Sequence, residues 1–184
     1  MAGYDISNLK ILVVDDSEHM RKIVCAILHA FHVQRIREAT DGADALKIAN
    51  VFQPDLIIAD WQMDPLDGIE MTRMLRRDQS FFNPFVPVIM LSGHTELKRV
   101  AEARDAGVTE FCAKPISART LYARIVTCIE NPRDFIRAAG YVGPDRKRHD
   151  SSAYRGQERR MASKGDEGAL DDLINDPADK TSGA

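Results

Sequence analysis

The sequence predicts an α/β protein, a (βα)5 doubly wound five-stranded parallel sheet, followed by a disordered C-terminal extension. From Lys10 to Glu130, short apolar runs alternate five times with amphipathic stretches, which is typical of a sheet covered by helices on both faces. Beyond Pro132 the apolar periodicity ends, and Gly, Pro, Ser, Asp, Arg and Lys dominate from Gly140 onward. Such a segment has too few apolar residues to form a core.

The expected strands are short and mostly apolar, as strands buried on both faces are. They are residues 11–14, 34–38, 56–59, 86–91 and 110–113. The first helix has apolar residues at the i, i+3, i+4, i+7 spacing of one helical face. These are Met20, Ile23, Val24, Ile27, Leu28 and Phe31. The last helix is expected over residues 117–130, with Ser117 as its N-cap and Pro132 beyond its end.

Composition limits the classes of protein that fit. The chain has 184 residues, 44% of them hydrophobic, and a net charge of -3, enough for one domain and an extension. No apolar run approaches the roughly 18 to 20 residues that span a bilayer, and residues 1–10 do not read as a secretory signal. Cys25, Cys112 and Cys128 lie among apolar residues without metal-ligand spacing, which suits core positions in a reducing compartment. We therefore expect a cytoplasmic protein without a membrane span.

The charges are unevenly distributed along the chain. Residues 131–164 carry nine Lys and Arg against four Asp and Glu, whereas residues 165–184 carry one Lys against six acidic residues. Sign asymmetry of this kind indicates an appended interaction segment. We therefore expect a domain over 8–130, an arginine-rich ligand-binding extension over 131–164 and an acidic disordered tail over 165–184.

Polar side chains follow four of the five expected strands. Asp15 and Asp16 come after the first, Asp60 after the third, Ser92 after the fourth and Lys114 after the fifth. Ligands of open parallel sheets bind at the carboxyl ends of the strands, so these groups should converge. Three carboxylates would repel one another without a cation, and Mg²⁺ is the hard ion that carboxylates and substrate phosphates share.

This combination suits phosphoryl transfer, in which charge neutralisation and positioning provide most of the catalysis. Asp60, at the end of the central strand, is the expected phosphoacceptor and nucleophile. Lys114 would pair with one phosphoryl oxygen and Ser92 would donate a hydrogen bond to another. An aspartate after a single strand is more often a turn former or a helix cap, but matching groups at four strand ends favour a site.

Four segments of the chain resemble the receiver domains of CheY-type response regulators. They are Ile-Leu-Val-Val-Asp-Asp at 11–16, Pro-Asp-Leu-Ile-Ile-Ala-Asp-Trp-Gln-Met at 54–63 with Asp67-Gly68, Val-Ile-Met-Leu-Ser-Gly at 88–93, and Phe-Cys-Ala-Lys-Pro at 111–115. The resemblance covers residues 8–130. It implies a flavodoxin/CheY-like fold and a histidine kinase or phosphotransfer protein as partner.

The resemblance also implies roles for individual residues. Asp16, Asp60 and the main-chain carbonyl of Gln62 would coordinate Mg²⁺, with Asp15 acting mainly through water. Ser92 would move to the acyl phosphate while the switch aromatic, Phe111, moves inward, and Lys114-Pro115 would be a cis peptide. Phe111 has no phenolic hydroxyl, so such a switch would work by packing alone. Pro65 stands one position later than the family's usual proline, which leaves Asp60 itself in place.

The extension contains two copies of the pattern Tyr-x-Gly-x-acid-Arg-basic. An Arg fork can pair with guanine O6 and N7, Tyr can stack on a base and acids can accept from the guanine N–H groups, so two copies suggest a ligand with two guanines, cyclic di-GMP. The candidate ligand residues are Tyr141, Asp145, Arg146 and Arg148 in the first copy, and Tyr154, Arg155, Glu158, Arg159 and Arg160 in the second.

The repeat resembles the arginine-rich extension of the CheY-like Cle proteins of Caulobacter. That resemblance covers roughly residues 133–164 and implies cyclic di-GMP as ligand and the flagellar motor switch as a partner. Arg133 and Arg137 lie outside the repeated unit. They could assist ligand binding or simply continue the last helix into solvent.

Three other functions remain open. The tail could be a non-specific polyanion arm for nucleic acid or acidic lipid, although its interspersed acids weaken this attraction. The chain could be a phosphorelay carrier with an inert linker. A phosphatase-type enzyme would need a second acid and a substrate-covering cap, which we cannot place, so we do not expect an enzyme. No helix-turn-helix pattern follows the domain, so we expect no specific DNA binding.

Overall fold

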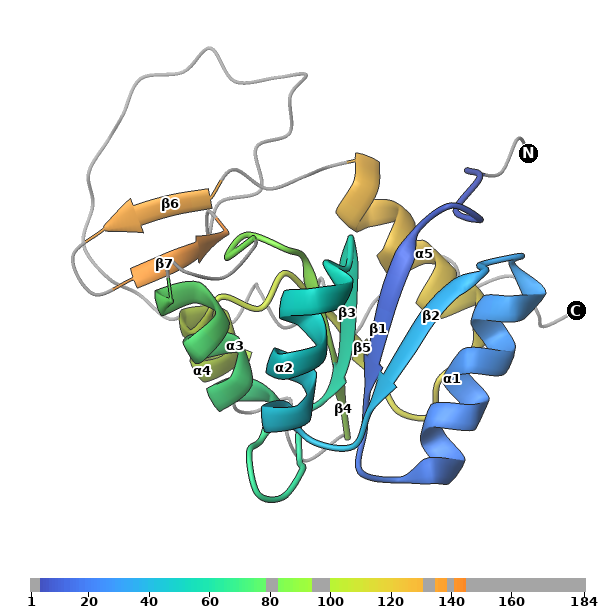
Figure 1. Ribbon diagram of the computed structural model, residues 1–184. Coiled ribbons are helices and arrows are strands. Elements are labelled where there is room, and N and C mark those ends of the chain that lie inside the picture. Colours follow the sequence, from blue (N-terminus) through green and yellow to red (C-terminus); the bar gives the residue numbers. More distant parts are fainter. Residues whose placement is uncertain (1–3, 79–82, 94–99, 131–134, 139–140, 145–184) are drawn as a thin grey trace, which may run out of the picture. The chain divides into compact units, whose positions relative to one another are not determined.

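The computed structural model describes residues 4–78, 83–93, 100–130, 135–138 and 141–144. All of them belong to one compact unit, Met1–Arg148. Its main sheet has five parallel strands, as the sequence predicts (Figure 1). Their order is β2-β1-β3-β4-β5. Within the described residues, no helix is long and apolar enough to cross a membrane.

Strands and helices alternate along this unit. The strands are β1 (Lys10–Val14), β2 (Arg35–Ala39), β3 (Leu56–Asp60), β4 (Val88–Ser92) and β5 (Glu110–Ala113). The helices are α1 (Glu18–Ala30), α2 (Gly42–Phe52), α3 (Gly68–Arg77), α4 (Val100–Ala106) and α5 (Ala118–Glu130). Each strand lies within two residues of its expected bounds. The main difference is that Asp60 and Ser92 are the last residues of β3 and β4 rather than the first residues after them.

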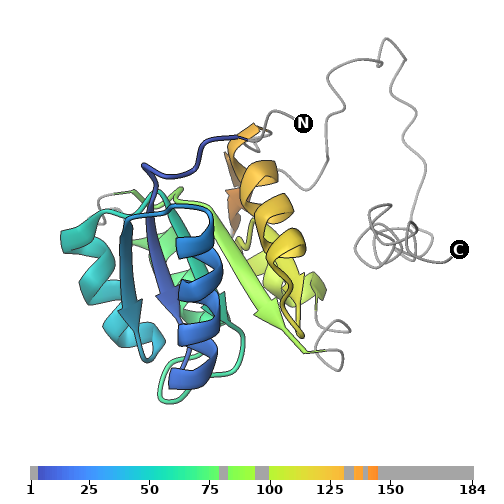
Figure 2. The ribbon, with the colours of Figure 1, turned by 90° about the vertical axis from the view of Figure 1, so that its right-hand side faces the viewer.

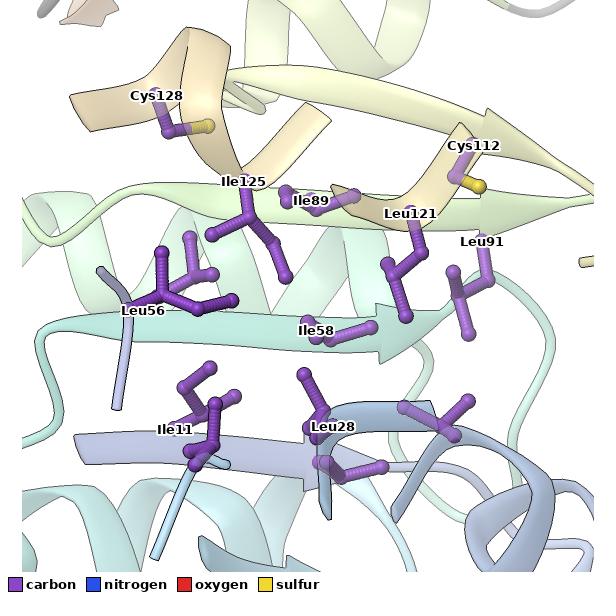
Figure 3. Close-up of a cluster of buried hydrophobic side chains, with 14 residues drawn as sticks. Ile11, Leu28, Leu56, Ile58, Ile89, Leu91, Cys112, Leu121, Ile125 and Cys128 are labelled. Carbon is purple, nitrogen blue, oxygen red and sulfur yellow. The ribbon is translucent and has the colours of Figure 1, made fainter. Parts of the chain in front are cut away.

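The helices cover both faces of the sheet. Helices α1 and α5 lie together on one face (Figure 2), where Leu28 of α1 and Leu121 and Ile125 of α5 pack against the sheet. Figure 3 shows these side chains directed at Ile58 and the other inward residues of the strands. On the other face, α2 contacts α3 and α3 contacts α4. Strands β3 and β4 are buried along their whole length, as strands covered on both sides must be.

Strand β2 differs from the others because it is outermost and largely exposed. Three of its five residues, Arg35, Arg37 and Glu38, are exposed. It therefore departs from the apolar pattern of the central strands. Among the described strands, it pairs with β1 alone.

Side-chain caps fix the starts of the helices. Ser17 caps α1, accepting from the Met20 N–H, and Asp41 caps α2. The Asp67 carboxylate accepts from the Glu70 N–H at 2.7 Å at the start of α3. The Ser117 hydroxyl accepts from the Thr120 N–H at 3.1 Å, so the predicted cap of the last helix is confirmed. Such caps satisfy backbone donors that a helix leaves unpaired.

A short antiparallel hairpin follows α5. Its strands are β6 (Phe135–Ala138) and β7 (Tyr141–Pro144), paired from Phe135–Pro144 to Ala138–Tyr141. The sequence predicts no regular element here, and Arg137 belongs to β6 rather than to a continued helix. Arg133 and residues 145–184 lie outside the described residues.

Candidate functional site

The strand order brings the predicted site residues to one edge of the sheet. Strand β1 lies between β2 and β3, so the chain reverses its winding direction beside β1, and ligands of open α/β sheets bind at such a point. The register pairs Val14 with Ala59, Asp60 with Leu91 and Ser92 with Ala113. The carboxyl ends of β1, β3, β4 and β5 therefore lie level with one another.

The three predicted carboxylates form a compact acidic cluster. Asp15, Asp16 and Asp60 each offer an oxygen, and these oxygens lie within 4.8 Å of one another. Asp15 is fully buried and Asp60 is 7% exposed, whereas Asp16 is exposed. A set of hard oxygen donors with one solvent-facing side suits Mg²⁺, which retains several waters when bound. The residues present therefore fit the ion that the sequence predicts.

The backbone of the acidic cluster is held by an arginine that sequence reasoning missed. Arg21 of α1 donates from Nη1 to the Asp15 carbonyl oxygen at 2.8 Å and, at 3.4 Å, to that of Asp16. Its Nε donates to Glu38 at 3.1 Å, and the Ser17 N–H donates to the Asp15 carboxylate. Arg21 follows Asp16 by five residues in the sequence. This spacing alone does not indicate a contact with the acidic cluster.

Lys114 supplies a cation to both buried carboxylates. Its Nζ lies 2.7 Å from Oδ1 of Asp60 and 3.5 Å from Oδ2 of Asp15. Burial raises the pKa of Asp60, Lys114 acts to lower it and the Asp15 charge acts to raise it, leaving the pKa raised. Burial lowers the pKa of Lys114, but its two carboxylate neighbours outweigh burial and raise it. Lys114 therefore remains protonated while the Asp60 carboxyl is more basic than an exposed aspartate.

Ser92 and Phe111 lie at the same end of the sheet. The Ser92 side chain is fully buried, and its hydroxyl has no hydrogen-bond partner among the described residues. A buried unpaired hydroxyl is costly, which marks Ser92 as a donor available for a ligand oxygen. Phe111 is 7% exposed, so its ring occupies an inward position in this structure.

The loop after Asp60 is packed tightly against the phosphoacceptor strand. The Trp61 N–H donates to Oδ1 of Asp60 at 2.8 Å, and the Gly68 N–H donates to the Trp61 carbonyl oxygen at 3.0 Å. A Cβ on Gly68 would overlap the Asp60 carbonyl oxygen, so only glycine fits there. Trp61 is buried and Gln62 is exposed.

Two X-Pro bonds near the site are cis. They are Lys114–Pro115, as the resemblance implies, and Asp64–Pro65, which sequence reasoning missed. Pro65, the proline that is displaced from the family pattern, is exposed.

The structure describes only the beginning of the predicted ligand segment. Tyr141 lies in β7. The other candidates of the two copies, Asp145, Arg146, Arg148, Tyr154, Arg155, Glu158, Arg159 and Arg160, lie outside the described residues.

Comparison with known proteins agrees with this site. The chain is 33% identical over 118 residues to the chemotaxis protein CheY-3 of Vibrio cholerae, covering 64% of this chain and 89% of that protein. It is 32% identical over 122 residues to the chemotaxis protein CheY of Pseudomonas aeruginosa, covering 66% of this chain and 97% of that protein. The solved structure of the chemotaxis response regulator CheY4 of Vibrio cholerae superposes with a TM-score of 0.58 and 31% identity, covering 64% of this chain and 96% of that one.

The family assignment covers nearly all of the five-stranded sheet and its helices. Residues 11–126 match the family described as the response regulator receiver domain. This span contains every residue of the acidic cluster together with Ser92, Phe111 and Lys114. The family match agrees with the five-stranded sheet and with the acidic cluster at its carboxyl edge. This chain therefore belongs to the response regulator receiver domain family of two-component signalling.

Proposed function

We propose that this protein is a phosphorylation-dependent switch whose phosphoacceptor is Asp60, and that it signals to a partner rather than acting as an enzyme on an external substrate. The observation that carries the proposal is the position of the Lys114 ammonium, 2.7 Å from the Asp60 carboxylate, beside the cluster of Asp15, Asp16 and Asp60. Membership of the receiver family supports a histidine kinase or phosphotransfer protein as phosphodonor.

In the proposed transfer, a carboxylate oxygen of Asp60 attacks the donor's phosphorus as the bond to the donor's leaving group breaks, giving an acyl phosphate. Lys114 neutralises charge on a phosphoryl oxygen, and the unpaired Ser92 hydroxyl donates to another. Asp15, Asp16, Asp60 and the main-chain carbonyl of Gln62 would hold Mg²⁺. The bound ion would neutralise charge on the transferring phosphoryl group.

Phosphorylation with a small donor tests the assignment. The protein is incubated with acetyl phosphate and Mg²⁺, the acyl phosphate is trapped with borohydride, and the labelled residue is found by mass spectrometry. We expect label at Asp60 and none in Asp60→Asn. Asp44 is a half-buried residue in the first turn of α2 and not a member of the acidic cluster. It provides a matched control, since Asp44→Asn should keep full labelling. Label at another residue, or full labelling of Asp60→Asn, would overturn the proposal.

We further propose that the arginine-rich extension binds cyclic di-GMP and that the ligand-bound protein acts on the flagellar motor switch or another chemotaxis component. The support is the doubled Tyr-x-Gly-x-acid-Arg-basic pattern, which offers each guanine an Arg fork and a Tyr ring. Two similar relatives are named chemotaxis proteins, which supports an output of that kind. The alternative is a phosphorylation-only receiver or phosphorelay carrier whose basic tail is a non-specific polyanion-binding linker.

Titration calorimetry with the full chain separates these functions. A bidentate Arg–guanine pair contributes about 1 to 3 kcal/mol, so Arg146→Ala or Arg159→Ala should weaken cyclic di-GMP binding roughly 5- to 150-fold. GMP and a short DNA duplex are titrated beside it at two salt concentrations. A polyanion linker would instead prefer DNA and lose binding steeply with salt. Preference for DNA, or unchanged cyclic di-GMP binding in both variants, would leave the tail as a basic linker.

A further inference from the structure

Arg21 connects the acidic cluster to the outer strand of the sheet. Its Nη1 donates to the Asp15 carbonyl oxygen at 2.8 Å and, in a longer bond of 3.4 Å, to that of Asp16. Its Nε donates to the Glu38 carboxylate of β2 at 3.1 Å. One guanidinium from α1 therefore contacts both the loop after β1 and the carboxyl-terminal part of β2.

The Arg21 side chain differs from an ordinary surface cation because it is largely buried. It is 12% exposed, whereas the Glu38 side chain is 49% exposed. A guanidinium removed from water needs partners for its N–H groups. Two of the three partners that it meets here are main-chain carbonyl oxygens rather than carboxylates. These contacts fix the course of the loop backbone as well as balancing the charge.

The two acids of the loop depend on Arg21 to different extents. The Asp15 N–H donates to the Ala39 carbonyl oxygen at 3.3 Å, and the buried Asp15 carboxylate accepts from the Ser17 N–H at 2.9 Å. Asp16 is exposed. Within the described part of the chain, the bond from Arg21 is the only hydrogen bond that Asp16 accepts. The position of its carboxylate therefore depends on how firmly the loop backbone is held.

The charge and the hydrogen bonds of Arg21 act on a bound cation in opposite directions. A positive group beside the acidic cluster repels Mg²⁺, although Glu38 offsets much of that charge. The hydrogen bonds favour Mg²⁺ because they hold the acids in place before the ion arrives. Groups that orient metal ligands contribute roughly 10- to 100-fold in affinity, whereas a balanced and screened charge contributes less. Positioning should therefore outweigh repulsion.

We propose that Arg21 is a positioning residue for the magnesium site, and that Glu38 assists it by fixing and neutralising its guanidinium. This inference rests on the proposed role of the acidic cluster in Mg²⁺-dependent phosphorylation of Asp60. It adds that the outer strand β2 contributes to the site, although none of the predicted metal ligands lies on that strand.

A Mg²⁺ titration of the full-length protein, followed by the fluorescence of Trp61, tests the sign of the effect. Arg21→Met removes the charge together with its hydrogen bonds. Lys22→Met removes the next positive charge along α1, on a side chain that is 71% exposed and pairs with Glu18. We expect Arg21→Met to weaken Mg²⁺ binding on the order of 10-fold. Lys22→Met should match the parent or bind Mg²⁺ slightly more tightly.

Glu38→Gln tests whether β2 acts through Arg21. In the parent it should weaken Mg²⁺ binding, because the guanidinium loses one partner and keeps an unbalanced charge. In an Arg21→Met background the same change should have a clearly smaller effect, since residues that act through one contact are not additive. Equal effects in the two backgrounds would contradict the part assigned to Glu38.

Two further measurements distinguish positioning from a general loss of stability. In the metal-free protein, Arg21→Met should speed hydrogen exchange at the Ser17 amide, which donates to the Asp15 carboxylate, while the amides of β3 keep their protection. In labelling by acetyl phosphate, the Mg²⁺ concentration that gives half the maximal rate should rise about 10-fold, while the rate at saturating Mg²⁺ falls much less. Within the described residues, Arg21 forms no hydrogen bond or ion pair with Asp60 or Lys114.

Unchanged or tighter Mg²⁺ binding in Arg21→Met would overturn the inference, because repulsion would then equal or exceed positioning. An equal loss of labelling rate at every Mg²⁺ concentration would also overturn it, since Arg21 would then only stabilise the fold. The proposed function fails in a different way. A parent that binds Mg²⁺ but is not labelled at Asp60 would refute phosphorylation there, while the Mg²⁺ affinities of the variants would still decide the role of Arg21.

Discussion

The Lys114 ammonium lies between two buried carboxylates, 2.7 Å from Asp60 and 3.5 Å from Asp15. In this arrangement one cation offsets two charges that burial would otherwise disfavour. Replacing Lys114 therefore has consequences for both acids. It removes the group that counteracts the raised pKa of Asp60 and the group that would meet the incoming phosphoryl oxygen.

We predict that Lys114→Met is phosphorylated by acetyl phosphate on the order of 100- to 1000-fold more slowly than the parent, the range seen when one preorganised charge-stabilising donor is lost. Lys22→Met is the matched control, because Lys22 forms an exposed surface pair with Glu18 and not with the carboxylates that Lys114 meets. Initial rates of acyl phosphate formation by mass spectrometry provide the measurement. Equal rates for the two variants would exclude a role for Lys114 in the transfer.

Magnesium affinity should respond differently to two residues of the predicted metal site. Asp16→Asn should weaken Mg²⁺ binding more than Gln62→Ala, because Asp16 would contribute a charged side chain whereas Gln62 would contribute only its backbone carbonyl. Trp61 is the single tryptophan and directly follows Asp60, so its fluorescence can follow a Mg²⁺ titration. Equal Mg²⁺ affinities in the two variants would contradict the assignment of Asp16 as a metal ligand.

Gly68→Ala should destabilise the domain and disturb the phosphoacceptor strand. The new methyl group would overlap the Asp60 carbonyl oxygen and approach the Met90 sulfur, and relieving such overpacking costs about 1 to 3 kcal/mol. Met74→Ala, at an exposed position of the same helix, is the control and should change stability little. Urea unfolding measures the difference. A Gly68→Ala protein as stable as the parent would mean that the loop adjusts without strain.

Because the Cys112 thiol is buried, we predict that the protein loses stability at alkaline pH. Burial raises the pKa of its thiol to about 11, and the side chain is 1% exposed. The unfolded chain loses the Cys112 proton at a lower pH than the folded protein does. The contribution of the thiol to the free energy of unfolding is therefore complete below its pKa in the unfolded chain, and it is lost as the pH rises through its pKa in the folded protein. Between pH 8 and 11 the parent should therefore lose about 2 kcal/mol more of its unfolding free energy than Cys112→Ala.

Urea titrations at several pH values test this difference. Lysines and tyrosines titrate in both proteins and cancel in the comparison, and the cavity left by Cys112→Ala shifts stability equally at each pH. A constant difference between the two proteins across the range would show that the thiol does not ionise on unfolding.

The fold and the core of the site followed from the sequence because both depend on local patterns. Buried strands read as apolar runs, and parallel strands bring their carboxyl ends together, so Asp15, Asp60 and Lys114 could be placed near one another without coordinates. Strand ends were less certain. Asp60 is part of β3 because the backbone pairing continues past it, with the Trp61 N–H donating to the Leu91 carbonyl oxygen at 3.0 Å.

The features that the sequence did not predict depend on contacts between distant residues. The role of Arg21 arises only when α1 lies over the acidic loop, and the restriction at Gly68 arises only when α3 begins against β3. The hairpin had no signal because the surface that orders Phe135 is formed by Arg76 and Phe85, about 50 residues earlier in the chain. Tertiary packing of this kind overrides the weak local preference of a short segment.

The charged outer strand β2 bears on how the protein behaves at high concentration. An edge strand presents unpaired backbone groups on which another chain can build, and charged side chains along it oppose such growth. Arg35, Arg37 and Glu38 are all exposed on β2. A strand from another chain that paired with β2 would therefore have to desolvate both positive and negative side chains. The charged side chains of β2 therefore oppose growth of the five-stranded sheet beyond this edge.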